Sequence, residues 1–351
     1  MQENSRRLPC LDGWRAIFCG VVLLDHFHRI GDGQLGVRCF FVLSGFLITS
    51  LLLAEVERTS TVNVAMFMAR RAIRLLPVYF VFLAVIAIFQ YRGVVSIPAS
   101  DWIAASTFVL NFVVELKNWT IFHLWSLSIE QQFYLAWPFL FLALAPWLHI
   151  RKLAIGFCGL IVFVVVFRMT SGAIHFWIKP APDLGLVQWV FSPVSTFAFV
   201  DVLGLGCFAA CIVFHYRERI QKMRRWLVYL LVVAAILLIV LSSYHFDVGA
   251  LRFARFIAGY TIAAAGCAVL VAISVVHPGF LLFRMLNSWP FIFMGTISYS
   301  AYIWQQPFTN IWLQDYSPNL RLLAVLGIAS LSYYLLERPF LWFRTALRPT
   351  I

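Results

Sequence analysis

Residues 73–90 read IRLLPVYFVFLAVIAIFQ, an apolar run that contains a single charged residue, Arg74. Coiled as a helix, a run of this length crosses the roughly 30 Å hydrocarbon core of a bilayer. Similar runs recur along the whole chain of 351 residues, of which 62% are hydrophobic and 12% are charged. The runs are continuous rather than alternating, which indicates membrane-spanning helices and not barrel strands. The sequence therefore predicts an all-α, polytopic helical membrane protein.

Hydropathy predicts about ten transmembrane spans in this chain. They fall near residues 14–29, 37–54, 73–90, 123–145, 153–169, 186–214, 226–242, 253–276, 290–313 and 321–343. A further apolar piece, residues 101–115, is short and polar in places, and we expect it to be re-entrant or interfacial. If it spanned the bilayer, the basic loop 217–225 would lie opposite the basic segment 70–74, against the positive-inside rule. No internal repeat or long linker divides the chain, so residues 1–351 are predicted to form one membrane-embedded domain.

The basic residues predict the orientation of the chain. With ten spans both termini lie in the cytoplasm, and Lys and Arg are then more frequent in cytoplasmic segments than in outer ones. The net charge of +12 is explained by this orientation, so nucleic acid is not an expected partner, whereas membrane lipid is. The start of the chain, MQENSRRLPC, resembles a signal peptide, but no small-residue cleavage site follows. We therefore expect a retained first span.

The first predicted span carries ionisable side chains, which are costly at membrane depth and therefore mark candidate functional sites. It ends in the segment GVVLLDHFHRIG, residues 20–31. Arg15 and His26 are eleven residues apart, which is close to three helical turns and a rise of about 16 Å, so they share one face. Asp25 and His28 point elsewhere, and His28 is expected at the membrane interface.

A second group of polar residues opens the fourth predicted span. The segment HLWSLSIEQQFYLAWP, residues 123–138, places Glu130 seven residues after His123 and one turn after Ser126. By helical rise, Glu130 lies about 10 Å below the outer surface, and His26 lies about 16 Å above the inner one. The two depths nearly coincide, so the imidazole and the carboxylate could act as a base and its orienting partner. The alternative is a structural hydrogen bond between two spans.

An arginine cluster lies at the cytoplasmic end of the third span. In FMARRAIRLLP, residues 67–77, Arg70 and Arg74 are one turn apart and Arg71 is adjacent, while Arg15 is expected at the same level. Guanidinium groups bind phosphates with bidentate geometry, so this cluster could receive a phosphorylated substrate. The alternative is contact with lipid headgroups and anchoring of the topology.

The ninth predicted span contains the segment GTISYSAYIWQQP, residues 295–307, in which Ser298 and Tyr302 face one side. These residues and Ser126 are candidate substrate contacts, although a serine in such a helix more often bonds to its own backbone. Asp201 lies within a span and needs a cationic or hydrogen-bonding partner. The seven cysteines contain no CxxC pair, and no metal site is expected.

Six of these segments, in this order, resemble the successive signatures of acyltransferase family 3, a family of integral membrane proteins. They are LDGWRAIFCGVVLLDH, GVRCFFVLSGFLIT, FMARRAIRLLPVY, HLWSLSIEQQFYLAWP, ISYSAYIWQQP and the closing LERP. The resemblance covers nearly the whole chain.

The resemblance implies an enzyme of about ten spans that takes acyl-CoA, most often acetyl-CoA, from the cytoplasm and transfers the acyl group to a hydroxyl. The acceptor is commonly an extracytoplasmic carbohydrate or glycolipid, and the location implied is the bacterial inner membrane. The family's essential arginine and histidine fall on Arg15 and His26, and its acidic position falls on Glu130. Its arginine cluster falls on residues 70–74. Relatives often carry an additional hydrolase-like domain, which we do not expect here.

The sequence departs from the family pattern at four positions, which concern substrate choice more than reaction type. Arg38 stands where Asp is common, Gln131 replaces a frequent Glu, Phe199 replaces a frequent Arg before Asp201, and Gln305 replaces a frequent His.

Together these features predict a mechanism. Arg15 and the cluster at residues 70–74 would hold the CoA phosphates, and His26, set by Glu130 or Asp25, would take the proton of the acceptor hydroxyl. Two alternatives remain at this stage. One is a transporter or flippase that uses the intramembrane His, Glu and Asp as a proton relay, and the other is acylation of a small molecule in the cytoplasm.

Overall fold

The computed structural model describes residues 9–113, 119–144, 150–177, 190–192, 194–243 and 254–341. Within these ranges every regular element is helical, which confirms the predicted all-α class. The long elements are α1 (Pro9–His28), α2 (Gly33–Thr59), α3 (Val64–Tyr91), α6 (Leu124–Leu144), α7 (Ile150–Trp177), α9 (Val200–Gln221), α10 (Arg225–Ser243), α12 (Tyr260–Val276), α14 (Trp289–Asn310) and α15 (Pro318–Ser332).

Seven helices of the described chain are long and apolar enough to cross a membrane. They cover Gly33–Thr59, Val64–Tyr91, Lys152–Ala173, Val200–Gln221, Arg225–Ser242, Arg255–Val276 and Pro318–Leu341. The other three predicted spans fall on α1, α6 and α14, which are of similar length but contain more polar residues. These three helices carry the candidate residues His26, Glu130 and Tyr302, whereas the arginine cluster lies on α3, one of the seven.

The short elements lie between the long ones. The apolar piece at residues 101–115 forms α4 (Ala99–Ser106) and the 3₁₀ turn η2 (Leu110–Phe112), with its last residues outside the described part, and it is too short to span. The predicted span at 186–214 is shifted, because the 3₁₀ turn η4 (Thr196–Ala198) precedes α9. The remaining short elements are α5 (Trp119–Phe122), α13 (Leu281–Leu286) and the π-helical turns η5 (Arg255–Gly259) and η6 (Tyr333–Glu337).

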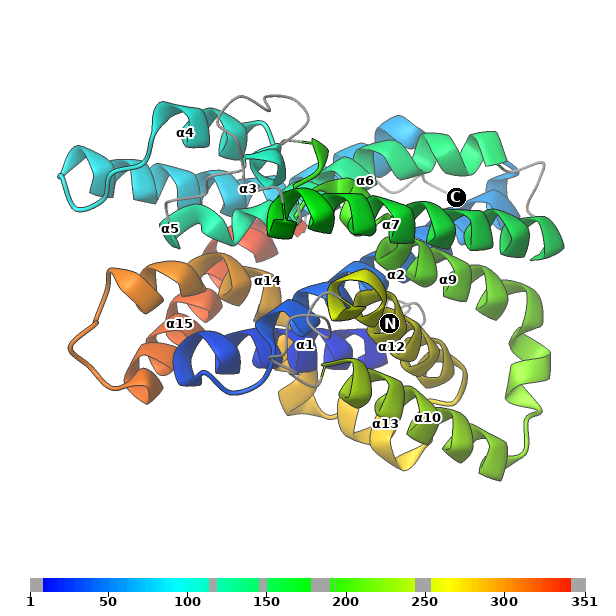
Figure 1. Cartoon of the computed structure of the whole chain (residues 1–351). Helices are drawn as coiled ribbons and strands as arrows, with labels where there is room; N and C mark the ends of the chain where they lie inside the picture. The colour runs from blue at the N-terminus through cyan, green and yellow to red at the C-terminus, as the bar shows by residue number, and fades with distance from the viewer. Residues whose placement is uncertain are drawn as a thin grey trace.

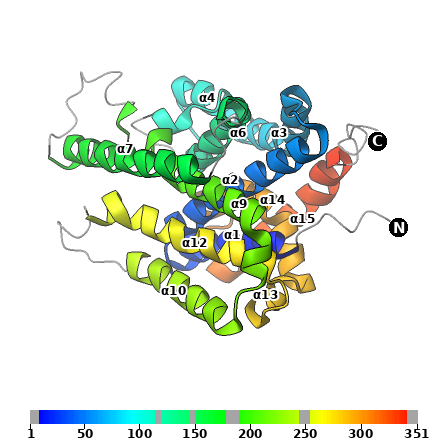
Figure 2. The same cartoon turned by 90° about the vertical axis from the view of Figure 1, so that its right-hand side faces the viewer.

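Helices α1, α2, α9 and α12 occupy the middle of the bundle, with α3, α4 and α6 on one side and α10 and α13 on the other (Figures 1 and 2). The most extensive helix contacts join α2 to α9 and α1 to α14. Glycines permit both: a Cβ at Gly45 would overlap the backbone of Leu203, and one at Gly295 would overlap the backbone of Asp12. The second approach brings the Arg15 turn of α1 against α14.

Candidate functional site

A cavity of about 80 Å³ lies among α1, α2, α3, α6 and α14. This volume is several times the roughly 10–15 Å³ that one water needs. Three of the predicted arginines, Arg15, Arg71 and Arg74, line it together with Glu130. The other polar residues of its wall are Ser44, Ser126, Tyr134, Thr296, Ser298, Tyr299 and Tyr302. We refer to this space as the arginine cavity.

Glu130 is held inside the arginine cavity by hydroxyl groups. Ser44 Oγ donates to Glu130 Oε1 at 2.6 Å, and Ser44 Oγ also pairs with the Tyr134 hydroxyl at 3.0 Å. The guanidinium groups of Arg15 and Arg71 both act electrostatically on the carboxyl group. The carboxylate therefore belongs to the arginine group, where it offsets part of the positive charge.

The fourth predicted arginine lies outside the cavity wall. Arg70 Nη2 forms an ion pair with Glu55 Oε2 at 3.0 Å, which joins α3 to the end of α2. Within the cavity, Arg15 Nη1 bonds to Asp12 Oδ1 at 3.2 Å, one turn earlier in α1. The structure thus brings together three of the four arginines, because Arg70 pairs with Glu55 of α2 instead of lining the cavity.

A further acid lies near the cavity and was missed from the sequence. Glu337 in η6 is buried, accepts a hydrogen bond from Ser300 Oγ at 2.5 Å, and acts electrostatically with Arg74 and Arg15. Its signal was present as the acid of LERP inside an apolar run. A buried carboxylate in a predicted span is a functional candidate by the same rule that selected Glu130.

His26 lies near the end of α1 that is remote from the arginines, about 16 Å from Arg15 by helical rise. Its Nδ1 bonds to Gln305 Oε1 at 3.1 Å, and its ring packs edge-on against Trp119 at 6.0 Å. Since an amide oxygen only accepts, the neutral ring carries its proton on Nδ1 and keeps the Nε2 lone pair. A lone pair on a half-buried imidazole is what a general base requires.

The hydrogen bond to His26 comes from neither Glu130 nor Asp25, although the Asp25 carboxylate acts on the ring electrostatically. Gln305 makes the hydrogen bond to the ring, and Glu130 bonds to Ser44. The Asp25 carboxylate lies against Gly33, at the N-terminus of α2, where a side chain would collide with it. Helix N-termini carry partial positive charge, so this position suits a carboxylate that caps the entry to α2.

A second histidine, His123, lies at the same end of the bundle as His26, which acts on it electrostatically. Pro307 lies inside α14 and has no N–H to donate to the carbonyl of Ile303. His123 Nε2 donates to that carbonyl instead, at 3.0 Å. The proton of the neutral ring is thereby placed on Nε2, and Nδ1 is left as an unpartnered, buried acceptor.

Tyr302 connects the arginine cavity to His123. Its hydroxyl pairs with Ser126 Oγ at 2.6 Å on the cavity wall, and its ring lies edge-on to the His123 ring at 5.7 Å. The hydroxyl also donates to the backbone carbonyl of His123 at 3.2 Å. Ser298, the other candidate, bonds to its own helix at Gly295 O, as expected for a serine in a span, and lines the cavity.

Asp201 was expected to have a cationic or hydrogen-bonding partner, and that partner is Arg168. The pair is fully buried, with Nη2 and Oδ1 at 2.8 Å. The guanidinium also bonds to the carbonyls of Ala198 and Ile257 and to the Thr261 hydroxyl, which in turn donates to Asp201 Oδ2. These contacts use all five donors of the arginine. We refer to Arg168, Asp201 and Thr261 as the buried ion-pair cluster.

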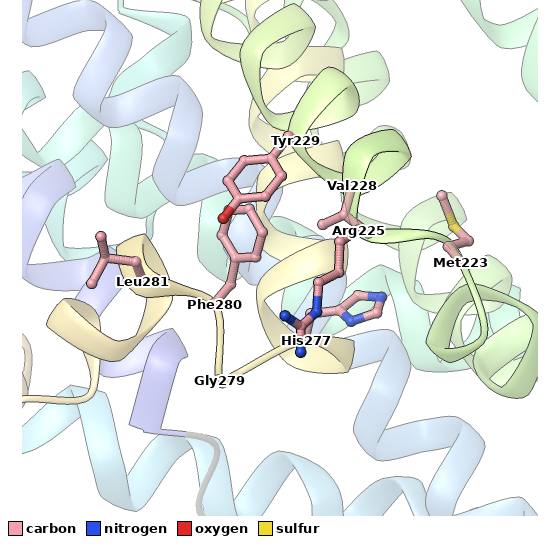
Figure 3. Close-up of a pocket in the computed structure, with 8 residues that line it drawn as sticks. All are labelled: Met223, Arg225, Val228, Tyr229, His277, Gly279, Phe280 and Leu281. Carbon is pink, nitrogen blue, oxygen red and sulfur yellow. The ribbon is translucent and has the colours of Figure 1, made fainter.

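A larger pocket of about 370 Å³ lies elsewhere, between the α9–α10 turn and the α12–α13 turn (Figure 3). Figure 3 shows its polar side chains, Arg225, His277 and Tyr229, among apolar ones. His277 Nε2 bonds to the carbonyl of Ile220 at 2.9 Å and so joins two turns. None of the predicted site residues lines this pocket, so the candidate active site is the arginine cavity with the two histidines beyond it.

Comparison with known proteins identifies the class to which this fold and site belong. Residues 8–341 match the model of the acyltransferase 3 domain, and the chain belongs to that family of membrane acyltransferases. It is 29% identical over 363 residues to the O-acetyltransferase OatA of Staphylococcus aureus, an alignment that covers 96% of this chain and 57% of the relative. It is also 29% identical over 366 residues to the peptidoglycan O-acetyltransferase OatA of Listeria monocytogenes, with coverages of 96% and 56%. The chain therefore spans a little over half the length of these relatives, and no solved structure matches it.

Proposed function

We propose that this chain transfers an acetyl or other short acyl group from acyl-CoA to a hydroxyl group of an extracytoplasmic carbohydrate. The observation that carries the proposal is that α1 connects two sites. Its Arg15 lines the arginine cavity with Arg71 and Arg74, and its His26, near the other end, is hydrogen-bonded through Nδ1 to Gln305. The relatives named as O-acetyltransferases support the acetyl group and the hydroxyl acceptor, and the peptidoglycan enzyme supports a carbohydrate.

The arginine cavity fits the phosphates of CoA. Arg15, Arg71 and Arg74 offer planar donors, and Glu130 with its serine and tyrosine limits the excess of charge. The 16 Å rise from Arg15 to His26 gives the distance that the extended arm of the donor would bridge along α1. We propose that this end faces the cytoplasm, with both termini, in a bacterial inner membrane.

His26 acts as the base in this proposal. The acceptor oxygen attacks the thioester carbon, an ester C–O bond forms, the C–S bond breaks, and the hydroxyl proton passes through His26 Nε2 to the departing sulfur. Gln305 Oε1 holds the Nδ1 proton and, as the ring becomes cationic, stabilises it. No step of this transfer changes an oxidation state.

The proposal is tested with purified protein, acetyl-CoA labelled in the acetyl group, and detergent-extracted glycan. The wild type should move label to the glycan, and His26→Ala should lower kcat by about 10²- to 10⁴-fold. His28→Ala, two residues further along the same helix, is the matched control and should behave as the wild type. A transporter would leave the thioester intact, and undiminished transfer by a well-folded His26→Ala variant would overturn the assignment of the base.

A further inference from the structure

One face of α14 is polar along most of its length. Ser298, Tyr302, Gln306 and Asn310 follow one another at intervals of four residues, so they lie above one another on the helix. The first two line the arginine cavity, and the last lies at the far end of the helix. We call these four residues the α14 stripe.

The α14 stripe faces the segment that joins α5 to α6. The Asn310 amide donates to Thr120 Oγ1 at 3.4 Å, and the Tyr302 hydroxyl bonds to Ser126 and to the His123 backbone. Gln306 lies one turn from each of Tyr302 and Asn310 and therefore between these contacts. The α14 stripe lies near His26, because Gln305, the partner of His26, is the residue before Gln306.

Among the residues that the structure describes, several side-chain atoms on or next to the α14 stripe have no hydrogen-bond partner. Gln306 is 0% exposed, and neither its Oε1 nor its Nε2 is paired. Buried amides in this state cost free energy and call for an explanation such as a ligand. The other unpaired atoms on or next to the stripe are His123 Nδ1, Trp304 Nε1, Gln305 Nε2 and Asn310 Oδ1.

A half-buried glutamine, Gln132, shows the contrast within this chain. Gln132 Nε2 donates to the carbonyl of Phe108 at 2.7 Å and to Asn111 Oδ1 at 2.8 Å, and its Oε1 accepts from Thr196. Gln132 thus joins α6 to η2 and η4 with every polar atom used. A structural glutamine in this bundle has partners at both ends of its amide, and Gln306 has none.

The unpaired atoms define the chemistry of the missing partner. They include donors, the amide and indole nitrogens, and acceptors, the amide oxygens and His123 Nδ1. A carboxylate or phosphate would satisfy only the donors, and an ammonium group only the acceptors, whereas a hydroxyl both donates and accepts. We infer that the α14 stripe, with His123, binds the hydroxyl groups of a neutral carbohydrate acceptor and presents one of them to His26. This inference deepens the proposed function and rests on it.

The first test compares thermal midpoints of unfolding in detergent. Removal of an unpaired buried amide relieves its desolvation cost, so Gln306→Leu should unfold at the wild-type temperature or above it. Gln132→Leu, the matched control, should unfold at a lower temperature because Phe108, Asn111 and Thr196 each lose a hydrogen bond. If Gln306→Leu loses as much stability as Gln132→Leu, Gln306 has a structural partner and the inference is overturned.

The second test measures binding of chitotetraose, a neutral tetrasaccharide, from the change in tryptophan fluorescence with no acyl donor present. Loss of the two amide contacts in Gln306→Leu should raise Kd about 10- to 100-fold. His123→Gln keeps a donor for Ile303 but removes the Nδ1 acceptor, and it should likewise weaken binding without loss of stability. Unchanged Kd in both variants, or no saturable binding by the wild type, would overturn the inference.

The two proposals can fail separately. If the wild type transfers acyl groups while Gln306→Leu retains both its KM for the glycan and its Kd for chitotetraose, the proposed function stands and the α14 stripe is not the acceptor site. If the variants lose chitotetraose but the wild type never transfers label from acetyl-CoA, the carbohydrate site stands and the proposed reaction fails.

Discussion

The buried ion-pair cluster and the α14 stripe are two polar regions in the interior of one bundle. They differ in how many of their polar atoms have a hydrogen-bond partner. In the first, all five donors of Arg168 are used, and Asp201 has a bond at each oxygen. In the second, Gln306 has no partner at either atom. Burial alone therefore does not distinguish a structural polar group from a functional one. The two regions are distinguished by how completely their polar atoms are hydrogen-bonded, because an unpaired buried group costs free energy and calls for a partner such as a ligand or a water.

The largest effect on stability should follow from breaking the buried ion-pair cluster. Arg168→Met leaves Asp201 as an uncompensated buried charge, which should lower the free energy of unfolding by about 3–5 kcal/mol. The double variant Arg168→Met with Asp201→Met should recover much of this loss. Unfolding in denaturing detergent, followed by circular dichroism, measures both. A single variant as stable as the wild type would contradict a purely structural cluster.

The arginine cavity extends the comparison, because its arginines line a cavity whereas Arg168 is enclosed by its hydrogen-bond partners. Arg74→Gln should raise KM for acetyl-CoA about 10- to 100-fold, as expected for loss of a charged hydrogen bond to a phosphate. Arg92→Gln, at the exposed opposite end of α3, is the control. If Arg74 contacts the 3′-phosphate, the KM values of the wild type and Arg74→Gln should differ less with dephospho-acetyl-CoA than with acetyl-CoA. Equal KM values in wild type and Arg74→Gln would remove Arg74 from the donor site.

The smallest effect should come from Pro307→Ala, which restores a backbone N–H opposite the Ile303 carbonyl. His123 would then share its acceptor, so kcat/KM should fall by less than about 10-fold. The thermal midpoint should not fall, because the helix gains a hydrogen bond. Steady-state kinetics at saturating donor measures the change. Activity equal to the wild type would show that this carbonyl does not set the His123 ring.

The class of the fold could be read from the sequence because membrane-spanning helices need long apolar runs. The arginine cavity was also largely predictable, since Arg71, Arg74 and Glu130 are charged residues within or beside predicted spans. Helical periodicity placed each of them on a face of its own helix. Helical spacing grouped Arg70 with Arg74, but its partner Glu55 comes from another helix, which no spacing within α3 reveals.

The position of one helix relative to its neighbour along the membrane normal could not be predicted in the same way. The expected meeting of His26 and Glu130 compared depths counted from the two membrane surfaces, whereas His26 lies two residues from the end of α1 and Glu130 bonds to Ser44 of α2. His123, the residue just before α6, is the group that His26 acts on electrostatically. The roles of Gln305 and Pro307 depend on contacts between helices, which no periodicity within one helix reveals.

Photoaffinity labelling with acyl-CoA that carries a diazirine in its acyl chain tests most directly whether the arginine cavity and the two histidines form one acyl-transfer route. After illumination and digestion, the account predicts CoA-competed labels on the end of α1 at His26 and on α14 around Tyr302 and Gln305. Competed labels confined to α7, α9 and α12, around the buried ion-pair cluster, would contradict it.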